Sequence, residues 1–218
     1  MVTIKFSNGK VLNSETEVNP ETILDNFEIQ KDEILALRVN NEICPIYKKI
    51  DVNSYVEPIL SSSSEGATIY RRSLCFVLAT ASHQIFPKKR LLVGHSLGHG
   101  YYYTIDGQNS LSETDIQKLK DEMQRLIDKN LTIKQEKISY EQAVKLFDDL
   151  GLVETRKQLK FTCPSKFVIN TLNDFSDLYF GPLVLKTGSL KVFDLIKYHE
   201  GFLLRFPKSG NSKSLDEF

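Results

Sequence analysis

The stretch Arg90–Gly107, RLLVGHSLGHGYYYTIDG, constrains the fold more than any other part of the chain. An apolar run leads into a bend that holds three glycines. A run of aromatic and β-branched residues follows and ends at Asp-Gly. Aromatic and β-branched residues favour strands, and clustered glycines favour a reversal of the chain. The stretch therefore predicts two antiparallel strands around a glycine-rich bend, so the fold must contain a sheet that accepts this hairpin.

Two other interpretations of the bend are chemical. The letters GHSLG at 94–98 match G-x-S-x-G, the nucleophile elbow of serine hydrolases, which needs a helix directly after the serine. Strand-forming residues follow Ser96 instead, which disfavours an elbow. His95 and His99 form H-x-x-x-H, which binds a metal when it lies on a helix. In an extended chain the two residues lie about 13 Å apart, too far for one ion, so the hairpin is favoured over both sites.

Composition limits the class of protein. The chain has 218 residues, with 28 basic and 28 acidic side chains. This balance argues against a broad, non-specific nucleic-acid surface but leaves room for a local basic patch. No apolar run reaches the length of a membrane span, and the first residues do not form a signal peptide. Three widely spaced cysteines, Cys44, Cys75 and Cys163, are typical of buried thiols in a reducing compartment. We therefore expect a cytoplasmic protein without membrane contact, as a monomer or an oligomer.

Residues 1–60 have the pattern of a small mixed sheet crossed by one helix. Asn8-Gly9 is a strong short signal for a hairpin, and Asn19-Pro20 is typical of a helix start. The pattern predicts a β-grasp-like domain, a fold that binds partners more often than it performs chemistry. The predicted strands are Val2–Phe6, Val11–Val18, Ile34–Val39, Ile43–Tyr47 and Ile50–Leu60.

A serine-rich segment, residues 61–66, predicts a linker to a second domain that spans residues 67–206. Apolar residues at helical spacing predict a long helix over Ala67–Phe86 and a second helix that begins at Ser112. Residues 207–218 are polar and predict the start of a further linker. The second helix has an apolar stripe at Ile116, Leu119, Met123, Leu126 and Ile127. Shorter elements are expected at 131–139, 139–150, 154–160, 167–169 and 193–206.

The chain also resembles a known family over nearly its whole length. Residues 2–60, including RVNNE at 38–42, are similar to the TGS domain that begins threonyl-tRNA synthetases. The remainder resembles the editing domain of those enzymes, most clearly at 111–143 and in DLYFGP at 177–182. The resemblance implies an α+β fold. A TGS-like β-grasp domain would precede an editing-like domain whose long helix packs on a mostly antiparallel sheet.

The positions that carry the chemistry of this family are replaced. Synthetase editing sites use H-x-x-x-H on the long helix, and a cysteine and a histidine in DLCRGPH. Collinear matching places these four positions at Arg72, Phe76, Tyr179 and Leu183, none of which can act as the original base or ligand. The resemblance therefore implies an editing-type fold without catalytic residues, and we expect no metal and no cofactor.

A second resemblance is to bacterial uridine kinase-like nucleoside kinases, which carry both domains ahead of a P-loop kinase domain. It is carried by YRRSL at 70–74 and GHSLGHGYYY at 94–103. The chain has no G-x-x-x-x-G-K-[ST], so ATP and magnesium would belong to a C-terminal kinase domain beyond it. The resemblance implies a non-catalytic, regulatory, ligand-binding region of a uridine kinase. Alternatives are a stand-alone aminoacyl-tRNA deacylase-like protein, a serine-type hydrolase and an RNA-end binding module.

The hairpin and the long helix supply a candidate ligand site. The glycines let a ligand approach the backbone, the tyrosines offer stacking surface, and two arginines of the helix add positive charge. The expected ligand is a nucleoside, a nucleotide or an RNA 3′ end. The residues expected to contact it are His95, Ser96, His99, Tyr101, Tyr103, Arg71 and Arg72.

Overall fold

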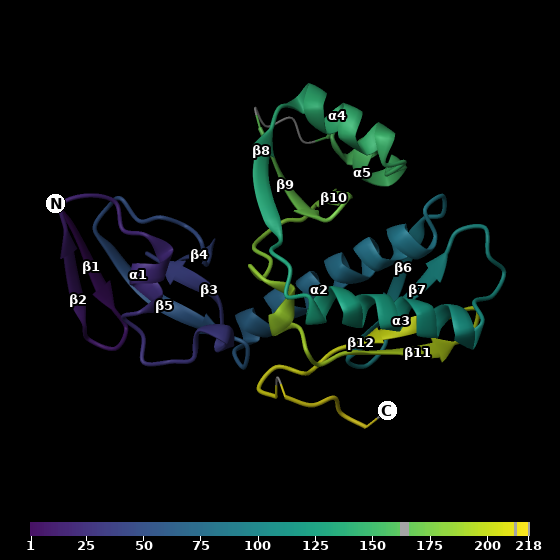
Figure 1. Cartoon of the computed structure of the whole chain (residues 1–218), viewed down its shortest axis with the longest axis horizontal. Helices are drawn as coiled ribbons and strands as arrows, with labels where there is room; N and C mark the ends of the chain where they lie inside the picture. Colours follow the sequence, from purple (N-terminus) through teal and green to yellow (C-terminus); the bar gives the residue numbers. More distant parts are fainter. Residues whose placement is uncertain (162–165, 212, 218) are drawn as a thin grey trace.

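The computed structural model describes residues 1–161, 166–211 and 213–217. The chain folds into three bodies (Figure 1). We call residues 1–60 the first unit. The main lobe consists of the two longest helices and a four-stranded sheet, and the small lobe is the separate body above them in Figure 1. The predicted α+β fold is confirmed.

The first unit is a five-stranded mixed sheet with one short helix across it. Its strand order is β2-β1-β5-β3-β4, with β1 parallel to β5 and the other pairs antiparallel. The predicted hairpin at Asn8-Gly9 is present, and Gly9 has a φ of 86°, which glycine adopts without strain. The elements are β1 (Val2–Phe6), β2 (Val11–Ser14), α1 (Pro20–Leu24), η1 (Lys31–Glu33), β3 (Ile34–Val39), β4 (Glu42–Pro45) and β5 (Ser54–Leu60).

Three strands of the first unit differ from the predicted bounds: β4 ends at Pro45 instead of Tyr47, β5 begins at Ser54 instead of Ile50, and β2 ends early. The expected strand Val11–Val18 ends at Ser14, because the chain bends there and the Thr16 amide donates to the Ser14 hydroxyl oxygen at 3.3 Å. Val18 still joins the sheet through an isolated antiparallel bridge to Ile50. The alternation of apolar residues thus predicted which residues would be paired but missed the bend between them.

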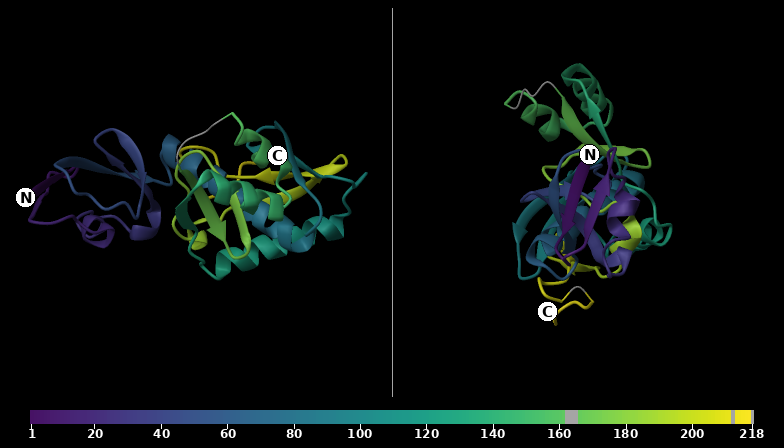
Figure 2. Two further views of the ribbon diagram at one scale, coloured as in Figure 1. Left: turned by 90° about the horizontal axis from the view of Figure 1, so that it is seen from above. Right: turned by 90° about the vertical axis from the view of Figure 1, so that its left-hand side faces the viewer.

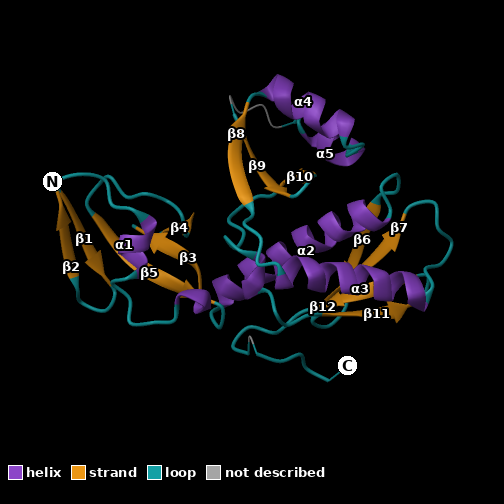
Figure 3. Ribbon diagram, in the orientation of Figure 1, coloured by secondary structure: helices purple, strands orange, loops and turns teal. Residues whose placement is uncertain are grey.

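The main lobe has two long helices on one face of an antiparallel sheet (Figure 3). The sheet order is β11-β12-β7-β6, so the glycine-rich hairpin forms its β6 and β7 strands as predicted. Strand β12 pairs with β7, although about a hundred residues separate them in sequence. The elements are α2 (Ser64–Ile85), β6 (Leu91–Ser96), β7 (Gly100–Ile105), α3 (Glu113–Asp128), η2 (Thr187–Ser189), β11 (Asp194–Tyr198) and β12 (Gly201–Arg205).

The start of α2 corrects the predicted linker. The helix begins at Ser64, not Ala67, because the Ser63 hydroxyl accepts a hydrogen bond from the Gly66 amide at 3.0 Å and caps the helix. Gly66 lies directly against the preceding strand: a Cβ there would stand 1.8 Å from the Leu60 carbonyl oxygen. The chain therefore passes from β5 to α2 through a tight turn instead of the flexible segment expected at 61–66.

Helix α3 follows the sequence prediction closely. Ser112 caps it in a capping box with Asp115, whose carboxylate accepts from the Ser112 amide at 3.3 Å. The predicted apolar stripe is buried against α2 and the sheet. Its members Ile116, Leu119, Met123, Leu126 and Ile127 are all buried.

The sequence led us to expect a single sheet in the second domain, whereas the structure has a further sheet in the small lobe. It is a separate three-stranded antiparallel sheet, order β10-β9-β8, covered by two helices. A core of its own holds Ala143, Phe147, Leu159, Phe167 and Ile169. The elements are β8 (Lys134–Ile138), α4 (Tyr140–Asp149), α5 (Val153–Gln158), β9 (Phe167–Leu172) and β10 (Phe175–Leu178).

The small lobe is inserted between α3 and β11, and the chain enters and leaves it side by side. The Ile133 amide donates to the Leu185 carbonyl and the Thr187 amide to the Leu131 carbonyl, each at 2.9 Å. In the right-hand view of Figure 2 the small lobe projects above the rest of the protein, and the Tyr47 hydroxyl of the first unit donates a hydrogen bond to Gln135 Oε1 of β8. No helix of the described residues is both long and apolar enough to cross a membrane.

Candidate functional site

A hollow lies between the main lobe and the small lobe. It is a cleft of about 780 Å³. Helix α2 and strands β6 and β7 form one wall; the α4–α5 turn and strand β10 form the other. The side chains at its centre are Cys75, Ala79, Ser82, His83, Tyr101, Tyr103, Thr155, Phe175, Asp177 and Tyr179. We refer to this hollow as the cleft.

Helix α2 presents small and polar side chains to the cleft at helical spacing. Cys75, Ala79 and Ser82 recur every three or four residues and therefore share one face of the helix. The Ser82 hydroxyl is buried and has no hydrogen-bond partner among the described residues. A buried hydroxyl without a partner costs free energy, so a ligand atom that bonds to it would gain that amount on binding.

The thiol of Cys75 is held in its neutral form. The Tyr103 hydroxyl donates a hydrogen bond to Cys75 Sγ at 3.1 Å. Burial raises the pKa of Cys75 above its usual value, and burial likewise raises the pKa of Tyr103. Because the thiolate is the nucleophilic form, this cysteine is suited to packing and weak hydrogen bonding, and poorly suited to attack on a substrate.

Asp177 is the carboxyl group on the small-lobe side of the cleft. Its Oδ1 accepts hydrogen bonds from the Thr155 hydroxyl at 3.1 Å and from the Leu178 amide at 2.7 Å. Burial raises the pKa of Asp177 to about 6 against those two hydrogen bonds, which lower it. Its Oδ2 accepts no hydrogen bond from the residues that the structure describes. Asp177 therefore offers the cleft a carboxylate oxygen that is ionised near neutral pH.

The four positions matched to the synthetase editing site are filled by packing. Phe76 is fully buried and meets the ring of Tyr179 edge to face, with ring centroids 5.3 Å apart. Leu183 is buried in the same core. The Arg72 guanidinium donates to the Pro182 carbonyl at 3.1 Å and leaves no room for a side chain at Gly181. Burial raises the pKa of Tyr179 well above its usual value, so its phenol stays neutral.

The structure brings together three of the seven residues predicted to contact a ligand. Ser96, Tyr101 and Tyr103 all line the cleft, from strands β6 and β7. Tyr101 packs against Phe206 with ring centroids 5.0 Å apart, which fixes the orientation of its ring. The hairpin thus contributes one wall of the site, as the sequence suggested.

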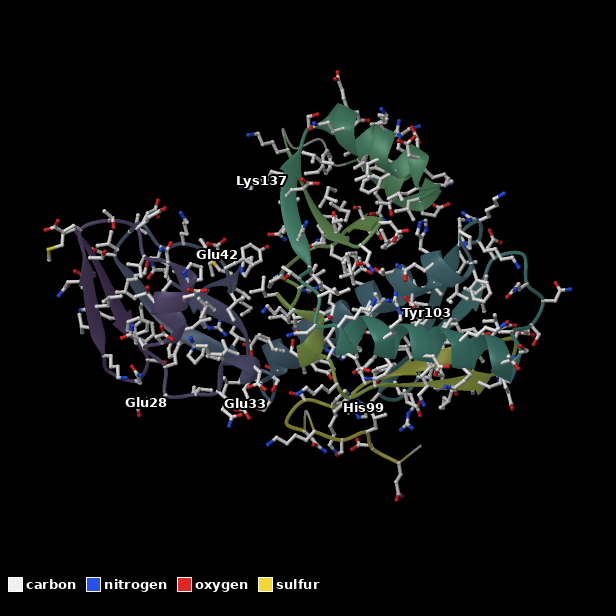
Figure 4. All side chains as sticks on the ribbon, in the orientation of Figure 1. Glu28, Glu33, Glu42, His99, Tyr103 and Lys137 are labelled. Atoms are coloured by element: carbon white, nitrogen blue, oxygen red, sulfur yellow. The ribbon has the colours of Figure 1, made fainter. Side chains whose placement is uncertain are left out.

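The other four predicted residues do not line the cleft. His95 packs on the ring of Tyr102, and Arg71 lies over the ring of Phe206. Arg72 is engaged at the Pro182 carbonyl, as described. His99 lies beside the C-terminal tail, with Nε2 3.7 Å from a carboxylate oxygen of Asp216, while Tyr103 lies inside the main lobe (Figure 4).

The two chemical interpretations of the bend find no matching geometry. Ser96 lies in strand β6, and strand β7 follows it, so the strand–turn–helix of a nucleophile elbow is replaced by a hairpin. His95 and His99 face different surroundings. Among the described residues, no three histidine, cysteine or acidic side chains cluster closely enough to hold a metal ion. Cys44 is buried and Cys75 partly so, whereas Cys163 lies outside the described residues.

Sequence reasoning missed the polar groups of the cleft, Ser82, Thr155 and Asp177. A serine on the apolar side of a long helix was a usable signal, since a buried hydroxyl needs a partner. Asp177 stood in the DLYFGP motif, but its exposure to a cleft depends on the small lobe, which the sequence did not reveal.

Ion pairs surround the mouth of the cleft. The Arg90 guanidinium on the main lobe contacts Asp106 at 2.6 Å and reaches across to Glu154 of the small lobe at 3.5 Å. Glu154 also pairs with Lys157 at 3.0 Å. These contacts join the two walls at their rim and neutralise the acidic groups there.

Comparison with known proteins finds sequences that are similar to this chain. No protein-family profile matches it. It is 27% identical over 199 residues to the threonine–tRNA ligase of Carboxydothermus hydrogenoformans and 30% identical over 202 residues to that of Halorhodospira halophila. Each match covers 90% of this chain and 31% of the relative. The threonine–tRNA ligase of Desulforamulus reducens is 31% identical over 169 residues, which cover 75% of this chain and 26% of the relative. The chain thus spans about a third of the length of these relatives.

These relatives correct one expectation. The chain was expected to be the N-terminal region of a uridine kinase-like nucleoside kinase, with a kinase domain as its partner. The proteins similar to it over 90% of its length are threonine–tRNA ligases, which contradicts the kinase interpretation. The pattern at 70–74 and 94–103 that suggested a kinase relative is explained by packing: it forms the start of α2 and the β6–β7 hairpin.

Proposed function

We propose that this chain is an RNA-end binding module related to threonine–tRNA ligases, and that its cleft holds the 3′-terminal nucleoside of a tRNA. The observation that carries the proposal is the cleft between the two lobes, with tyrosines and the unpaired Ser82 hydroxyl on one wall and the Asp177 carboxyl group on the other. Its relatives are threonine–tRNA ligases, and this supplies the class of RNA.

The shape and chemistry of the cleft suit a nucleoside. Its volume of about 780 Å³ falls in the range of small-ligand sites, which are mostly apolar with a few placed polar groups. The ring of Tyr101 offers a surface for stacking, which proteins that bind single-stranded RNA ends commonly use. The free oxygen of Asp177 accepts a hydrogen bond from an amino group, and the Ser82 hydroxyl pairs with a hydroxyl or ring nitrogen.

Binding without hydrolysis is favoured by the groups that surround the cleft. The four editing positions hold Arg72, Phe76, Tyr179 and Leu183, which pack and do not activate water. The thiol of Cys75 stays protonated, because burial raises its pKa. A module of this kind would recognise an RNA end and present or protect it.

A second candidate function is deacylation of an aminoacyl-tRNA, and one observation favours it. Asp177 has a pKa raised to about 6, close to the value that suits a general base at neutral pH. It would take a proton from a water molecule as the water attacks the ester carbonyl. The ester bond would then break, and the ribose oxygen would leave with a proton.

A fluorescent probe in the cleft wall tests the binding proposal. The chain has no tryptophan, and Val93 lies exposed on the cleft wall, so Val93→Trp places a single reporter there. We expect the trinucleotide CCA to change its emission in a saturable way. Val52→Trp, at an exposed valine of the first unit, is the matched control and should not respond. Equal responses at both positions, or none at position 93, would contradict the proposal.

A cleft variant and a product assay separate the two functions. Tyr101→Leu should weaken binding of CCA by about tenfold, because stacking of a base on an aromatic ring contributes about 1–3 kcal/mol. Incubation of the protein with aminoacyl-tRNA should release no amino acid beyond the spontaneous rate. Release that Asp177→Asn abolishes would instead establish the deacylase and reject the binding-only function.

A further inference from the structure

We infer that the phosphate backbone of the bound RNA end runs over Lys88 and Lys89 at the mouth of the cleft. The inference rests on the proposed function and adds to it a direction: the terminal nucleoside enters the cleft, and the phosphates behind it stay at this rim. Both lysines line the cleft, in the turn between α2 and β6.

The position of the two lysines is fixed by the end of α2. The helix ends at Ile85, and the Lys89 amide donates to the Phe86 carbonyl at 2.9 Å, which closes a turn directly after it. Pro87 lies between Phe86 and Lys88 and cannot continue the helix. Lys88 and Lys89 are therefore exposed side chains on an ordered turn at the rim.

Three acidic groups around this rim already have cationic partners. Arg90 contacts both Asp106 and Glu154, and Arg156 contacts Asp148 at 3.4 Å. Lys88 forms no ion pair with any described residue. Lys89 acts at a distance on Asp115, whose pKa it helps to lower as the weakest of several causes. The lysines thus keep their charge available for a ligand at a rim where Asp106, Glu154 and Asp148 are already paired.

A helix C-terminus favours lysines even where no ligand binds, because cations there interact well with the helix dipole. That explanation accounts for the charge of the turn but not for its position on the rim of the cleft. Negative charge inside the cleft gives a second argument for phosphates at the rim. Asp177 lines the cleft, and its charge disfavours a phosphate inside it. An RNA end therefore binds with its base inside and its phosphates at the lysines.

Salt dependence of binding measures phosphate contacts directly. Each contact to single-stranded RNA contributes about 0.7 to the slope of log K against log salt concentration. We expect Lys88→Ala/Lys89→Ala to reduce the slope for a CCA-ended RNA hexanucleotide by about 1.4, with about tenfold weaker binding near 0.15 M salt. Binding of adenosine, which has no phosphate, should not change. The Val93→Trp reporter serves for both ligands.

The matched control removes the same charge elsewhere. Lys134→Ala/Lys137→Ala deletes two exposed lysines of β8, which do not line the cleft. Lys137 is labelled on β8 in Figure 4. This variant should keep the wild-type slope. An unchanged slope in the Lys88 and Lys89 variant, with normal adenosine and RNA binding, would overturn the inference and leave the proposed function intact. Failure of the wild-type protein to bind either ligand would instead reject the proposed function.

An RNA with a terminal 3′-phosphate gives an independent readout. Its extra phosphate would lie beside Asp177, so we expect it to bind several-fold more weakly than the same RNA with a free 3′-hydroxyl. Asp177→Asn should reduce this difference. If the two RNAs bind equally well to the wild-type protein, the inferred direction of the RNA is wrong.

Discussion

Replacing Asp177 by asparagine should stabilise the protein, and only above a defined pH. Burial raises the pKa of Asp177 from 3.8 to about 6, a change of about 2 units. Each unit corresponds to about 1.4 kcal/mol, so the ionised carboxylate costs the folded state about 3 kcal/mol at most. The asparagine oxygen can still accept the hydrogen bonds from Thr155 and Leu178, so the substitution removes the charge and keeps the geometry.

The pH dependence follows from the direction of the shift. Below about pH 4 the carboxyl group is protonated in both the folded and unfolded states, and the substitution should have little effect. Between about pH 4 and pH 6 the unfolded state releases its proton first, so the wild-type protein progressively loses stability relative to Asp177→Asn. Above about pH 6 the difference should reach its full value of about 2–3 kcal/mol and stay constant.

Urea unfolding followed by circular dichroism at about pH 4 and pH 8 measures this difference. Asp174→Asn, at the exposed turn that leads into β10, controls for loss of one negative charge nearby. Its effect should be small and similar at both pH values, because the side chain is exposed and an asparagine oxygen can still accept the hydrogen bond from Gln84 Nε2. If Asp177→Asn destabilises the protein at pH 8, or shifts stability equally at both pH values, burial of this carboxylate does not control its ionisation.

Three other substitutions test the packing that positions the cleft. Gly66→Ala should destabilise the protein by several kcal/mol in urea unfolding, because the added Cβ would stand 1.8 Å from the Leu60 carbonyl oxygen. A loss of less than about 1 kcal/mol would show that the backbone of the turn can shift to accept the Cβ. Leu119→Ala should cost about 2–5 kcal/mol, since the side chain is fully buried, and a smaller loss would show that the core collapses around it. Tyr103→Phe removes the hydroxyl that donates to Cys75 and so raises the pKa of the thiol further. Alkylation of Cys75 near neutral pH should therefore become slower, and faster alkylation would contradict this role of the hydroxyl.

Local patterns predicted most of the elements. The stripe of α3, the Asn8-Gly9 hairpin and the glycine-rich hairpin at 90–107 all appear as expected. Each depends on residues close together in sequence, whose spacing records the period of a helix or the turn of a hairpin. The TGS-like and editing-like layout came from the resemblance, and the α+β fold agrees with it.

The cleft could not be predicted in the same way, because its walls come from distant parts of the chain. Cys75 and Ser82 on α2 face Asp177, about a hundred residues later, only because the small lobe folds back over α2. No local pattern records that arrangement. Arg71 and Arg72 do not line the cleft for a similar reason. The directions of their side chains depend on contacts with Phe206 and Pro182, which lie far along the chain.

The pairing of β12 with β7 has a consequence for synthesis on the ribosome. The main lobe gains its central strand pair only after residues 201–205 have emerged, whereas the small lobe needs nothing beyond Leu178 for its sheet. We therefore expect the small lobe to acquire structure first during translation. Until β12 has emerged, one edge of β7 remains unpaired. A nascent chain that stalls before Gly201 would expose that edge, which is a template for aggregation.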